Sequence, residues 1–366
     1  MSIDSIDKML QIKNTENFSK DIWIWGTGNT AEMLQEGLKR WNRFGQVKGY
    51  LDSNPSRWGK TFYGKPIDNP AKMGNKDDVV VLICTNQLNF LGEIRELIEK
   101  NNIKNSYLLE EFVLLDLREN VLKTSKLFDD AKSEKLFEYL VQCKLRGEYP
   151  SAESGLLDID HGYFFMPGIL STDEEVLVDV GCYTGDTIEE FTEVKGNHFE
   201  KIISFEPDKI SYEKAVLNIE KVCEKYNIPS EMIALFPYGV GEKTQEGVFE
   251  RFEESAGSGS KFVTGKNTGD VPAIKIVALD DFLQERISFL KADVESYEYQ
   301  VIMGATRLIR EYKPNLAICL YHNVFDFIQI PELIKNLVPE YKLYLRQQEE
   351  SWCETILYAT VKDMGE

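Results

Sequence analysis

Short, continuous apolar runs alternate along the chain with stretches of helical spacing. In the N-terminal third the apolar runs lie at residues 22–25, 46–52 and 77–85, and helical patterns lie at about 29–41 and 90–101. Apolar runs that lack polar alternation are typical of strands buried on both faces of a parallel sheet. We therefore predict a small Rossmann-like unit that ends before residue 120.

The rest of the chain repeats this pattern on a larger scale. A charged, helical stretch at about 120–150 fits a connector, and it fits equally well as part of the second domain. Seven strand-like runs then follow, at 175–181, 201–207, 232–240, 287–295, 314–322, 341–347 and 354–362. Helical segments separate the first five runs, which predicts a parallel, doubly wound sheet. No full crossover helix separates the last two, which predicts an antiparallel hairpin at the edge.

The predicted fold is therefore α/β with two domains. We place the Rossmann-like domain at residues 1–120, a helical connector at 121–150 and the second domain at 151–366. The second domain has a seven-stranded, mostly parallel sheet with an antiparallel last strand.

Composition and charge narrow the class of protein. The formal net charge of −19 at pH 7 argues against binding to nucleic acid or to an anionic membrane surface, because both need clustered Lys and Arg. The six cysteines are scattered without a CxxC pair, which indicates reduced thiols. The N-terminus lacks the pattern of a secretory signal, and no run approaches the roughly 20 apolar residues of a membrane span. We expect a cytoplasmic enzyme.

The first of two glycine loops lies in DIWIWGTGNTAE. Gly26, Gly28 and Ala31 form a G-x-G-x-x-A pattern, and Asp52 follows near where a ribose-binding acid would stand. This pattern alone is weak evidence of function. Binding of a nucleotide or nucleotide-sugar, docking of a partner and oligomerisation are all open roles for the domain.

The second glycine loop, VLVDVGCYTGDT, differs in charge. Gly181 and Gly185 let the backbone pass close to a ligand, and Asp179 and Asp186 place carboxylates beside it. Two carboxylates would repel the pyrophosphate that a dinucleotide places at such a helix N-terminus. S-adenosylmethionine (SAM) instead offers an amino acid moiety and a sulfonium cation, which carboxylates attract. The loop therefore favours SAM, with a structural turn and a capping Asp as the alternative.

An acid also stands at the tip of the next strand, in SFEPD. Glu206 can accept hydrogen bonds from both ribose hydroxyls of an adenosine, a group that SAM and NAD share. A surface acid that caps the next helix is the alternative. Pro207 and Asp208 then begin that helix in the usual way.

Candidate catalytic residues lie at the carboxyl ends of the fourth and fifth runs. Asp293 and Glu295 are two positions apart and so share a face if the strand continues, and His322 reaches the same edge. A hydroxyl that attacks a methyl sulfonium must lose its proton, which a His or a carboxylate can accept. A rim histidine with a structural role is the alternative for His322. The three ligand types suit a metal, but we predict none in the absence of a further carboxylate cluster.

The region from about 160 to 360 resembles the FkbM family of SAM-dependent methyltransferases. The resemblance rests on VLVDVGCYTGDTIEEF, ISFEPDKISYEKAVLNI, IVALDDFL, the stretch from ISFLKADVE to CLYH, and WCETILYA. It implies a class I SAM methyltransferase that O-methylates a hydroxyl of a sugar, glycan or related small molecule. Ser296 departs from the glycine that usually follows D-x-E in this family. The stretch at 254–262 resembles the family's Gly/Ser-rich substrate-side loop, with a flexible hairpin tip as the alternative.

The motifs and the resemblance together assign the cofactor site. The predicted SAM-binding residues are Asp179, Gly181, Tyr183, Thr184, Gly185, Asp186, Thr187, Glu206, Pro207, Asp208, Gly239, Val240 and Asp293. Asp293 and Glu295 are expected beside the methyl-transfer centre, and the acceptor is expected to be a small molecule or a glycan. Two other functions are open: an NAD(P)-dependent sugar-modifying oxidoreductase that uses the first loop, or a non-catalytic nucleotide-binding or assembly protein. A homo-oligomer is also open.

Overall fold

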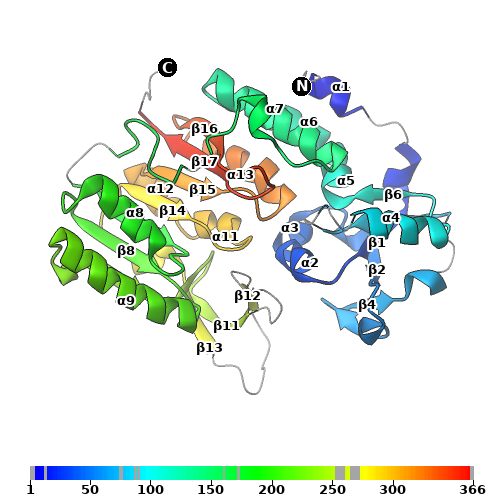
Figure 1. The fold of residues 1–366 in the computed structure, drawn as a ribbon, viewed down its shortest axis with the longest axis horizontal. Helices are drawn as coiled ribbons and strands as arrows, with labels where there is room; N and C mark the ends of the chain where they lie inside the picture. Colours follow the sequence, from blue (N-terminus) through cyan, green and yellow to red (C-terminus); the bar gives the residue numbers. More distant parts are fainter. Residues whose placement is uncertain are drawn as a thin grey trace.

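The computed structural model describes residues 5–11, 15–73, 77–85, 88, 91–159, 161–170, 174–251, 260–263 and 273–362. These residues form two α/β units, each built on its own largely parallel sheet (Figure 1). The predicted two-domain α/β fold is confirmed. The boundaries at residues 120 and 150 stay a prediction.

The N-terminal sheet has six strands in the order β3-β4-β2-β1-β5-β6. Its central strand β1 runs parallel to β2 on one side and to β5 on the other, with Ile22 and Ile24 fully buried. The strands are β1 (Asp21–Trp25), β2 (Val47–Leu51), β3 (Thr61–Phe62), β4 (Lys65–Asp68), β5 (Val79–Ile83) and β6 (Ser106–Leu108), and the helices are α2 (Asn29–Met33), α3 (Gln35–Arg40) and α4 (Leu91–Lys100). The apolar pattern does not predict β3, β4 or β6, because such short strands show no period.

Helices connect the two sheets at the top of Figure 1. They are α5 (Leu109–Asp116), α6 (Arg118–Thr124) and α7 (Ala131–Arg146), and a short α1 (Ile6–Met9) lies against α7. Asp130 caps α7 by accepting a hydrogen bond from the Ser133 amide, and Gly147 ends the helix with a φ of 66°. The loop before α7 also joins the second sheet, because the Asp129 amide donates to the Leu343 carbonyl at 2.9 Å.

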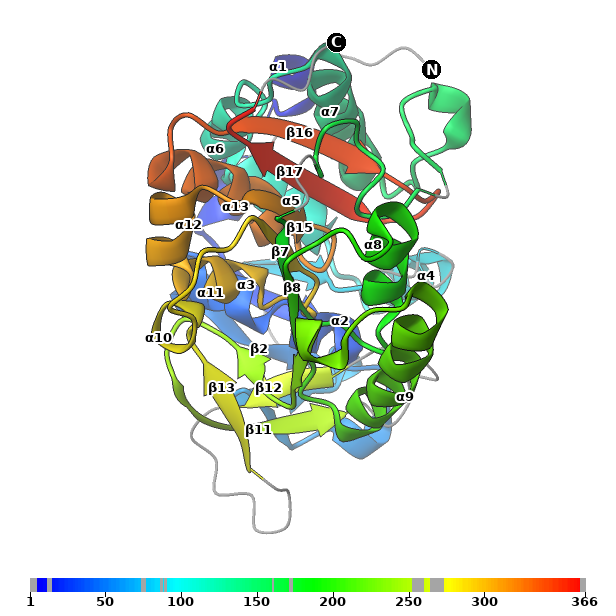
Figure 2. The ribbon, with the colours of Figure 1, turned by 90° about the vertical axis from the view of Figure 1, so that its left-hand side faces the viewer.

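The C-terminal sheet has seven strands in the order β16-β17-β15-β14-β7-β8-β9. Five are parallel, and β17 runs antiparallel to both of its neighbours, as predicted. The strands are β7 (Val176–Val180), β8 (Lys201–Phe205), β9 (Ile233–Phe236), β14 (Phe289–Ala292), β15 (Asn315–Cys319), β16 (Lys342–Gln347) and β17 (Thr355–Thr360). Helices α8 (Asp186–Lys195) and α9 (Lys209–Tyr226) cover one face; the other is covered by α10 (Leu279–Phe282), α11 (Glu298–Met303), α12 (Thr306–Tyr312) and α13 (Val324–Leu337) (Figure 2).

The third predicted run of this sheet, at 232–240, is wrong in its second half. Strand β9 ends at Phe236, because Pro237 has no amide hydrogen to continue the ladder. Gly239 and Val240 form β10 in a separate four-stranded sheet with β11 (Gln245–Arg251), β12 (Ser260–Val263) and β13 (Ala273–Val277), in the order β10-β13-β11-β12. Of the predicted substrate-side loop, residues 254–259 lie outside the described residues, and 260–262 belong to β12.

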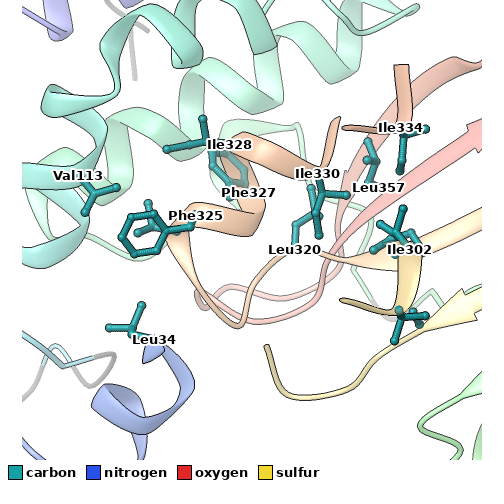
Figure 3. Packing of buried hydrophobic residues seen from close by; sticks show 14 of the residues in the cluster. Leu34, Val113, Ile302, Leu320, Phe325, Phe327, Ile328, Ile330, Ile334 and Leu357 are labelled. Atoms are coloured by element: carbon teal, nitrogen blue, oxygen red, sulfur yellow. The ribbon is translucent and has the colours of Figure 1, made fainter. Parts of the chain in front are cut away.

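One hydrophobic core runs through both units. Helix α13 of the C-terminal unit packs its apolar residues against the N-terminal unit, and Figure 3 shows Phe325 between Leu34 and Val113. The ring centroids of Phe325 and Trp41 lie 5.8 Å apart. None of the helices in the described part of the chain combines the length and the apolar character that crossing a membrane requires.

Candidate active site

The loop after β7 is shaped by two glycines in the left-handed region. Gly181 has a φ of 80° and Gly185 a φ of 84°, and Gly185 directly precedes α8. A side chain at Gly181 would place its Cβ 1.9 Å from the carbonyl oxygen of Asp293, so only glycine fits there. The loop therefore lies directly against the tip of β14, where the candidate catalytic residues begin.

Asp179 is fully buried below this loop, and neither of its carboxylate oxygens has a hydrogen-bond partner among the described residues. The ammonium of Lys291 forms an ion pair with one of them at 3.2 Å, and it also donates a hydrogen bond to the Gly181 carbonyl at 2.7 Å. Burial raises the pKa of Asp179, and Lys291 offsets only part of that effect. The buried carboxylate is thus already paired with one cationic group, the ammonium of Lys291.

Glu206 links the loop to the start of α9. One carboxylate oxygen accepts from the Tyr183 amide at 2.9 Å and the other from the Asp208 amide at 2.8 Å. Burial raises the pKa of Glu206 to about 7, although these two amides lower it. A carboxylate can accept about four hydrogen bonds, so both oxygens can still receive hydroxyl groups.

Most of the other predicted SAM residues lie on or near the glycine loop, and two lie in another sheet. Asp208 caps α9. On the loop and at the start of α8, Thr187 is buried, Thr184 is half-buried, and Tyr183 and Asp186 are exposed. Pro207 lies between Glu206 and that cap. Gly239 and Val240 lie in β10, in a different sheet from the loop.

The structure brings Asp293, Glu295 and His322 together. Nε2 of His322 lies 3.4 Å from a carboxylate oxygen of Asp293 and 3.6 Å from one of Glu295. Nδ1 of His322 lies 2.8 Å from Oε1 of Glu298, a fully buried acid at the start of α11. The imidazole is therefore held between carboxylates on both sides.

The three predicted catalytic groups differ in their readiness to take a proton. Burial lowers the pKa of His322, but Glu298, Glu295 and Asp293 outweigh it and raise that pKa well above its usual range, so the ring holds a proton. Burial raises the pKa of Asp293, but Lys291, His322 and two tyrosine hydroxyls outweigh it. Burial raises the pKa of Glu295 to about 7, against the effect of His322. Glu295 is thus the group whose pKa lies nearest to neutral pH.

Two tyrosines hold Asp293 in place. The hydroxyl of Tyr163 donates to one carboxylate oxygen at 2.9 Å, and that of Tyr321 donates to the other at 3.1 Å. The carboxylate of Glu295 has no described hydrogen bond, and its contact with His322 leaves 26% of its side chain exposed. The side chain of Asp293 is about as exposed, at 24%, so the two acids differ in their hydrogen bonds and not in their accessibility.

A tight backbone turn directs these acids. Glu295 has a φ of 53° and Ser296 a φ of 77°, both in the left-handed region that favours glycine. Ser296 thus adopts a conformation that favours glycine, at a cost of roughly 1–2 kcal/mol.

The same cluster holds ligand atoms at metal-binding distance. Asp293, Glu298 and His322 each offer one such atom, all within 4.8 Å of one another, the one such group found among the described residues. The expectation that no metal binds here stays a prediction.

Sequence reasoning missed four residues of this site: Lys291, Glu298, Tyr163 and Tyr321. A lysine inside the apolar run ISFLKAD was a signal, because Lys is almost never fully buried unless it is paired. Tyr163 comes from the loop before β7, and nothing in its local pattern marks it.

The first glycine loop has a different environment. Gly26 has a φ of 123°, and a Cβ there would lie 2.7 Å from the carbonyl oxygen of Cys84. The carboxylate of Asp52 accepts from the Thr27 hydroxyl and from the Asn54 amide, and Arg57 lies 3.6 Å from it. Arg57 also donates to Thr27. Asp52 therefore holds the loop much as Glu206 holds its own, and it differs from Glu206 in facing a guanidinium.

Comparisons with known proteins agree with the second site. Residues 179–350, which span the glycine loop, Glu206 and the catalytic cluster, match the model of the methyltransferase FkbM domain. This region is an FkbM methyltransferase domain. The FkbM domain makes the protein a methyltransferase, and its cofactor is SAM. The fit is visible in the glycine cradle at Gly181 and in the carboxylate of Glu206, which can accept further hydrogen bonds.

Solved structures place the fold of the FkbM domain and of the chain around it. The methyltransferase FkbM of Methylobacillus flagellatus KT is 21% identical, with a TM-score of 0.55, and the match covers 92% of this chain and 89% of that one. An rRNA methylase from Streptococcus thermophilus is 14% identical, with a TM-score of 0.33 and coverage of 52% and 89%. TrmK of M. capricolum in complex with S-adenosylhomocysteine is 10% identical, with a TM-score of 0.28 and coverage of 53% and 65%. No curated protein matches the chain.

Proposed function

We propose that this enzyme O-methylates a hydroxyl group of a neutral sugar or glycan, with Glu295 as the general base. The observation that carries the proposal is the contrast within the acidic cluster. Glu295 has no described hydrogen bond and a pKa of about 7, whereas Asp293, which is about equally exposed, accepts from two tyrosine hydroxyls, and the carboxylates around His322 raise the pKa of its imidazole. A base poised near neutral pH is what deprotonation of a hydroxyl requires.

The cofactor would be held by Asp179, by the loop from Gly181 to Gly185 and by Glu206. Bound SAM supplies an electrophilic methyl group that passes to the acceptor oxygen. Glu295 accepts the proton that this oxygen loses, and the imidazolium of His322, aligned by Glu298, stabilises the carboxylate of Glu295 beside it. Asp293 stays ionised and fixes the two tyrosines that line the same edge.

The charge of the site supports a neutral acceptor. Glu354 lies within electrostatic reach of Asp293, and burial raises its pKa to about 7. Together with Glu295 it gives the region around His322 an acidic character. Above about pH 7, where Glu295 and Glu354 are ionised, these carboxylates repel phosphorylated or carboxylated acceptors. The uncharged hydroxyls of a sugar fit this environment, and they match the expectation from the family resemblance.

A transfer assay tests the proposal. The purified chain is incubated with methyl-labelled SAM, a panel of neutral mono- and oligosaccharides, and the phosphorylated counterparts of the same sugars. We expect label on neutral hydroxyls and none on the phosphorylated set. Label found only on amines or on phosphorylated sugars would overturn the proposal.

Calorimetry tests the rival functions. We expect SAM to bind and NAD not to bind. Binding of NAD without binding of SAM would favour an oxidoreductase that uses the first glycine loop. Binding of SAM without transfer to any acceptor in the panel would favour a non-catalytic role.

A further inference from the structure

One short helix of the N-terminal unit touches both helices that begin next to the candidate catalytic residues. Helix α3 contacts α11 through Glu36, which accepts from the side-chain amide of Gln300 at 3.0 Å, and through Arg40, whose guanidinium lies 4.2 Å from the ring centre of Tyr299. It contacts α13 through Arg40 as well. Figures 1 and 2 both show α3 beside α11.

The contacts with α13 are polar and steric. Arg40 forms an ion pair with Asp326 and donates from Nε to the side chain of Gln329 at 3.0 Å. Asp326 is 1% exposed and Arg40 is 17% exposed, so the pair is shielded from water. At Gly37, a Cβ would lie 2.3 Å from the ring of Phe325, so the backbone of α3 rests directly on α13.

Both contacted helices begin at the catalytic cluster. Helix α11 starts at Glu298, three positions after Glu295, and the carboxylate of Glu298 binds Nδ1 of His322. Helix α13 starts directly after His322 and Asn323. Asn323 caps it: its side-chain oxygen accepts from the Asp326 amide at 2.9 Å, and its side-chain nitrogen donates to the Asp326 carboxylate at 2.6 Å. The residue that Arg40 holds is therefore the one that fixes the cap next to His322.

We infer that α3 is a cross-domain strut that sets the alignment of His322 with Glu298, with Arg40 as its principal positioning residue. The N-terminal unit would then contribute to the reaction without touching cofactor or acceptor. The inference rests on the proposed function where it assigns a catalytic purpose to that alignment; the alignment itself is tested without any acceptor.

Nuclear magnetic resonance of the histidine side chains provides that test. The chain has three histidines, so ¹⁵N-histidine labelling gives three titrations, and a His322→Gln variant identifies the one that matters. Asp293, Glu295 and Glu298 lie against His322, and Asp326, Glu354 and Cys353 are within its electrostatic reach. Removal of Arg40 leaves the carboxylate of Asp326 unpaired, an effect that by itself also raises the pKa of His322. In the wild type we expect His322 to stay protonated above pH 7.

The Arg40→Ala variant separates positioning from simple electrostatics by the sign of the shift. Loss of a nearby positive charge alone raises the pKa of a histidine. Loss of alignment with Glu298 lowers it, because the imidazolium loses its closest carboxylate. We expect a fall of about one unit, and partial recovery in Arg40→Lys. An unchanged or raised pKa in a folded Arg40→Ala protein would overturn the inference.

A charge-neutral variant covers the case in which Arg40→Ala does not fold. Gly37→Ala inserts a methyl group against Phe325 and should displace α13, so the pKa of His322 should fall here too. Gly45→Ala is the matched control, because a Cβ at Gly45 has no neighbour within 4 Å. Asn120→Ala removes a different contact to α13, the 3.4 Å bond to Glu332, and should leave the pKa unchanged. Equal shifts in Gly37→Ala and in the two controls would also overturn the inference.

Kinetics then connect alignment to chemistry. With an acceptor in hand, Arg40→Ala should lower kcat roughly tenfold to a hundredfold, while the Kd for SAM stays within twofold of the wild type. A fall in the His322 pKa without any change in kcat would uphold the strut and contradict the proposed role of the cluster. A fall in kcat without a change in that pKa would contradict the strut alone.

Discussion

The two glycine loops of this chain share one plan and differ in what their acids contact. Each leaves a central parallel strand and enters a helix, and each relies on a glycine that presses against a neighbouring carbonyl: Gly26 against Cys84 and Gly181 against Asp293. Asp52 in the first unit is held by Thr27 and by the amide of its own turn. In the second unit, Asp179 is fully buried and lies 3.2 Å from the ammonium of Lys291, whereas Glu206 accepts from two backbone amides and can accept further hydrogen bonds.

This difference shows what a glycine fingerprint reports. The glycines record that the backbone turns tightly at the carboxyl edge of a sheet, and both loops do so. Whether a ligand binds there depends on side chains that keep hydrogen-bonding capacity, and the spacing of glycines does not encode that. The first loop matches the dinucleotide-binding glycine pattern more closely, and the second loop has the side chains that are more suitable for binding a cofactor.

The largest expected effect comes from Glu295, which has no counterpart in the first unit. Replacement by Gln keeps the shape of the side chain and removes its ability to accept a proton. We expect kcat to fall by roughly 10²–10⁴-fold, with the Kd for SAM changed little. Labelled-methyl transfer and calorimetry measure the two quantities. Glu285→Gln, which changes an exposed acid of the same domain, is the control; equal activity in the two variants would remove Glu295 from the mechanism.

The second-largest expected effect concerns Glu206, which follows β8, and its counterpart Asp52, which follows β2 in the first unit. Glu206→Gln removes a charged acceptor for ribose hydroxyls, and we expect SAM affinity to fall roughly tenfold or more, since a hydrogen bond to a charged group contributes about 1.5–3 kcal/mol. Asp52→Asn makes the same change in the first unit and should leave SAM affinity unchanged. Calorimetry on both variants decides, and a loss of affinity in Asp52→Asn alone would reverse the assignment of the two loops.

The pH dependence of turnover sharpens the role of Glu295. The base acts when it is deprotonated, so kcat should rise as the pH increases through its pKa of about 7. Between pH 6 and pH 8 the deprotonated fraction increases about tenfold. The measurement is made at saturating SAM, because Glu206 titrates in the same range. The rise should persist in Glu354→Gln and vanish in Glu295→Gln; a flat wild-type profile contradicts the assignment.

The smallest effect concerns the turn after Glu295. Ser296→Gly relieves a left-handed conformation that serine adopts at a cost, and we expect an increase of roughly 0.5–1 kcal/mol in the free energy of unfolding. Chemical denaturation measures it. Ser296→Ala removes the hydroxyl and keeps the strained backbone, so it should stabilise less. Equal stabilisation by both variants would attribute the gain to the buried hydroxyl, which has no described hydrogen bond.

Much of the fold follows from local pattern. The apolar runs around Val178, Ile203 and Leu316 form strands, as predicted. A strand covered by helices on both faces of its sheet buries every side chain, so its sequence is continuously apolar. The hairpin-like end of the sheet also follows, from the missing crossover helix. The small β10-β13-β11-β12 sheet does not, because its short strands pair across gaps in sequence that no local period marks.

The site is predictable to the extent that it lies at strand ends. Asp179, Glu206, Asp293 and His322 meet at one edge because parallel strands end together. Their protonation states are not predictable in this way. Whether His322 or Glu295 is the better base depends on Glu298, and Glu298 is brought to Nδ1 by the packing of α11 rather than by its position in the sequence.

The shared core has a consequence for how this chain can be divided or recombined. Phe325 and Ile328 are fully buried, and Phe325 lies against residues of the N-terminal unit. A cut near residue 150 would expose such side chains to water, at a cost of about 1.5–3 kcal/mol for each one that becomes fully exposed. The methyltransferase domain is therefore not an interchangeable module: a new N-terminal partner would have to present a glycine, a tryptophan and an arginine where α3 and Trp41 present them now.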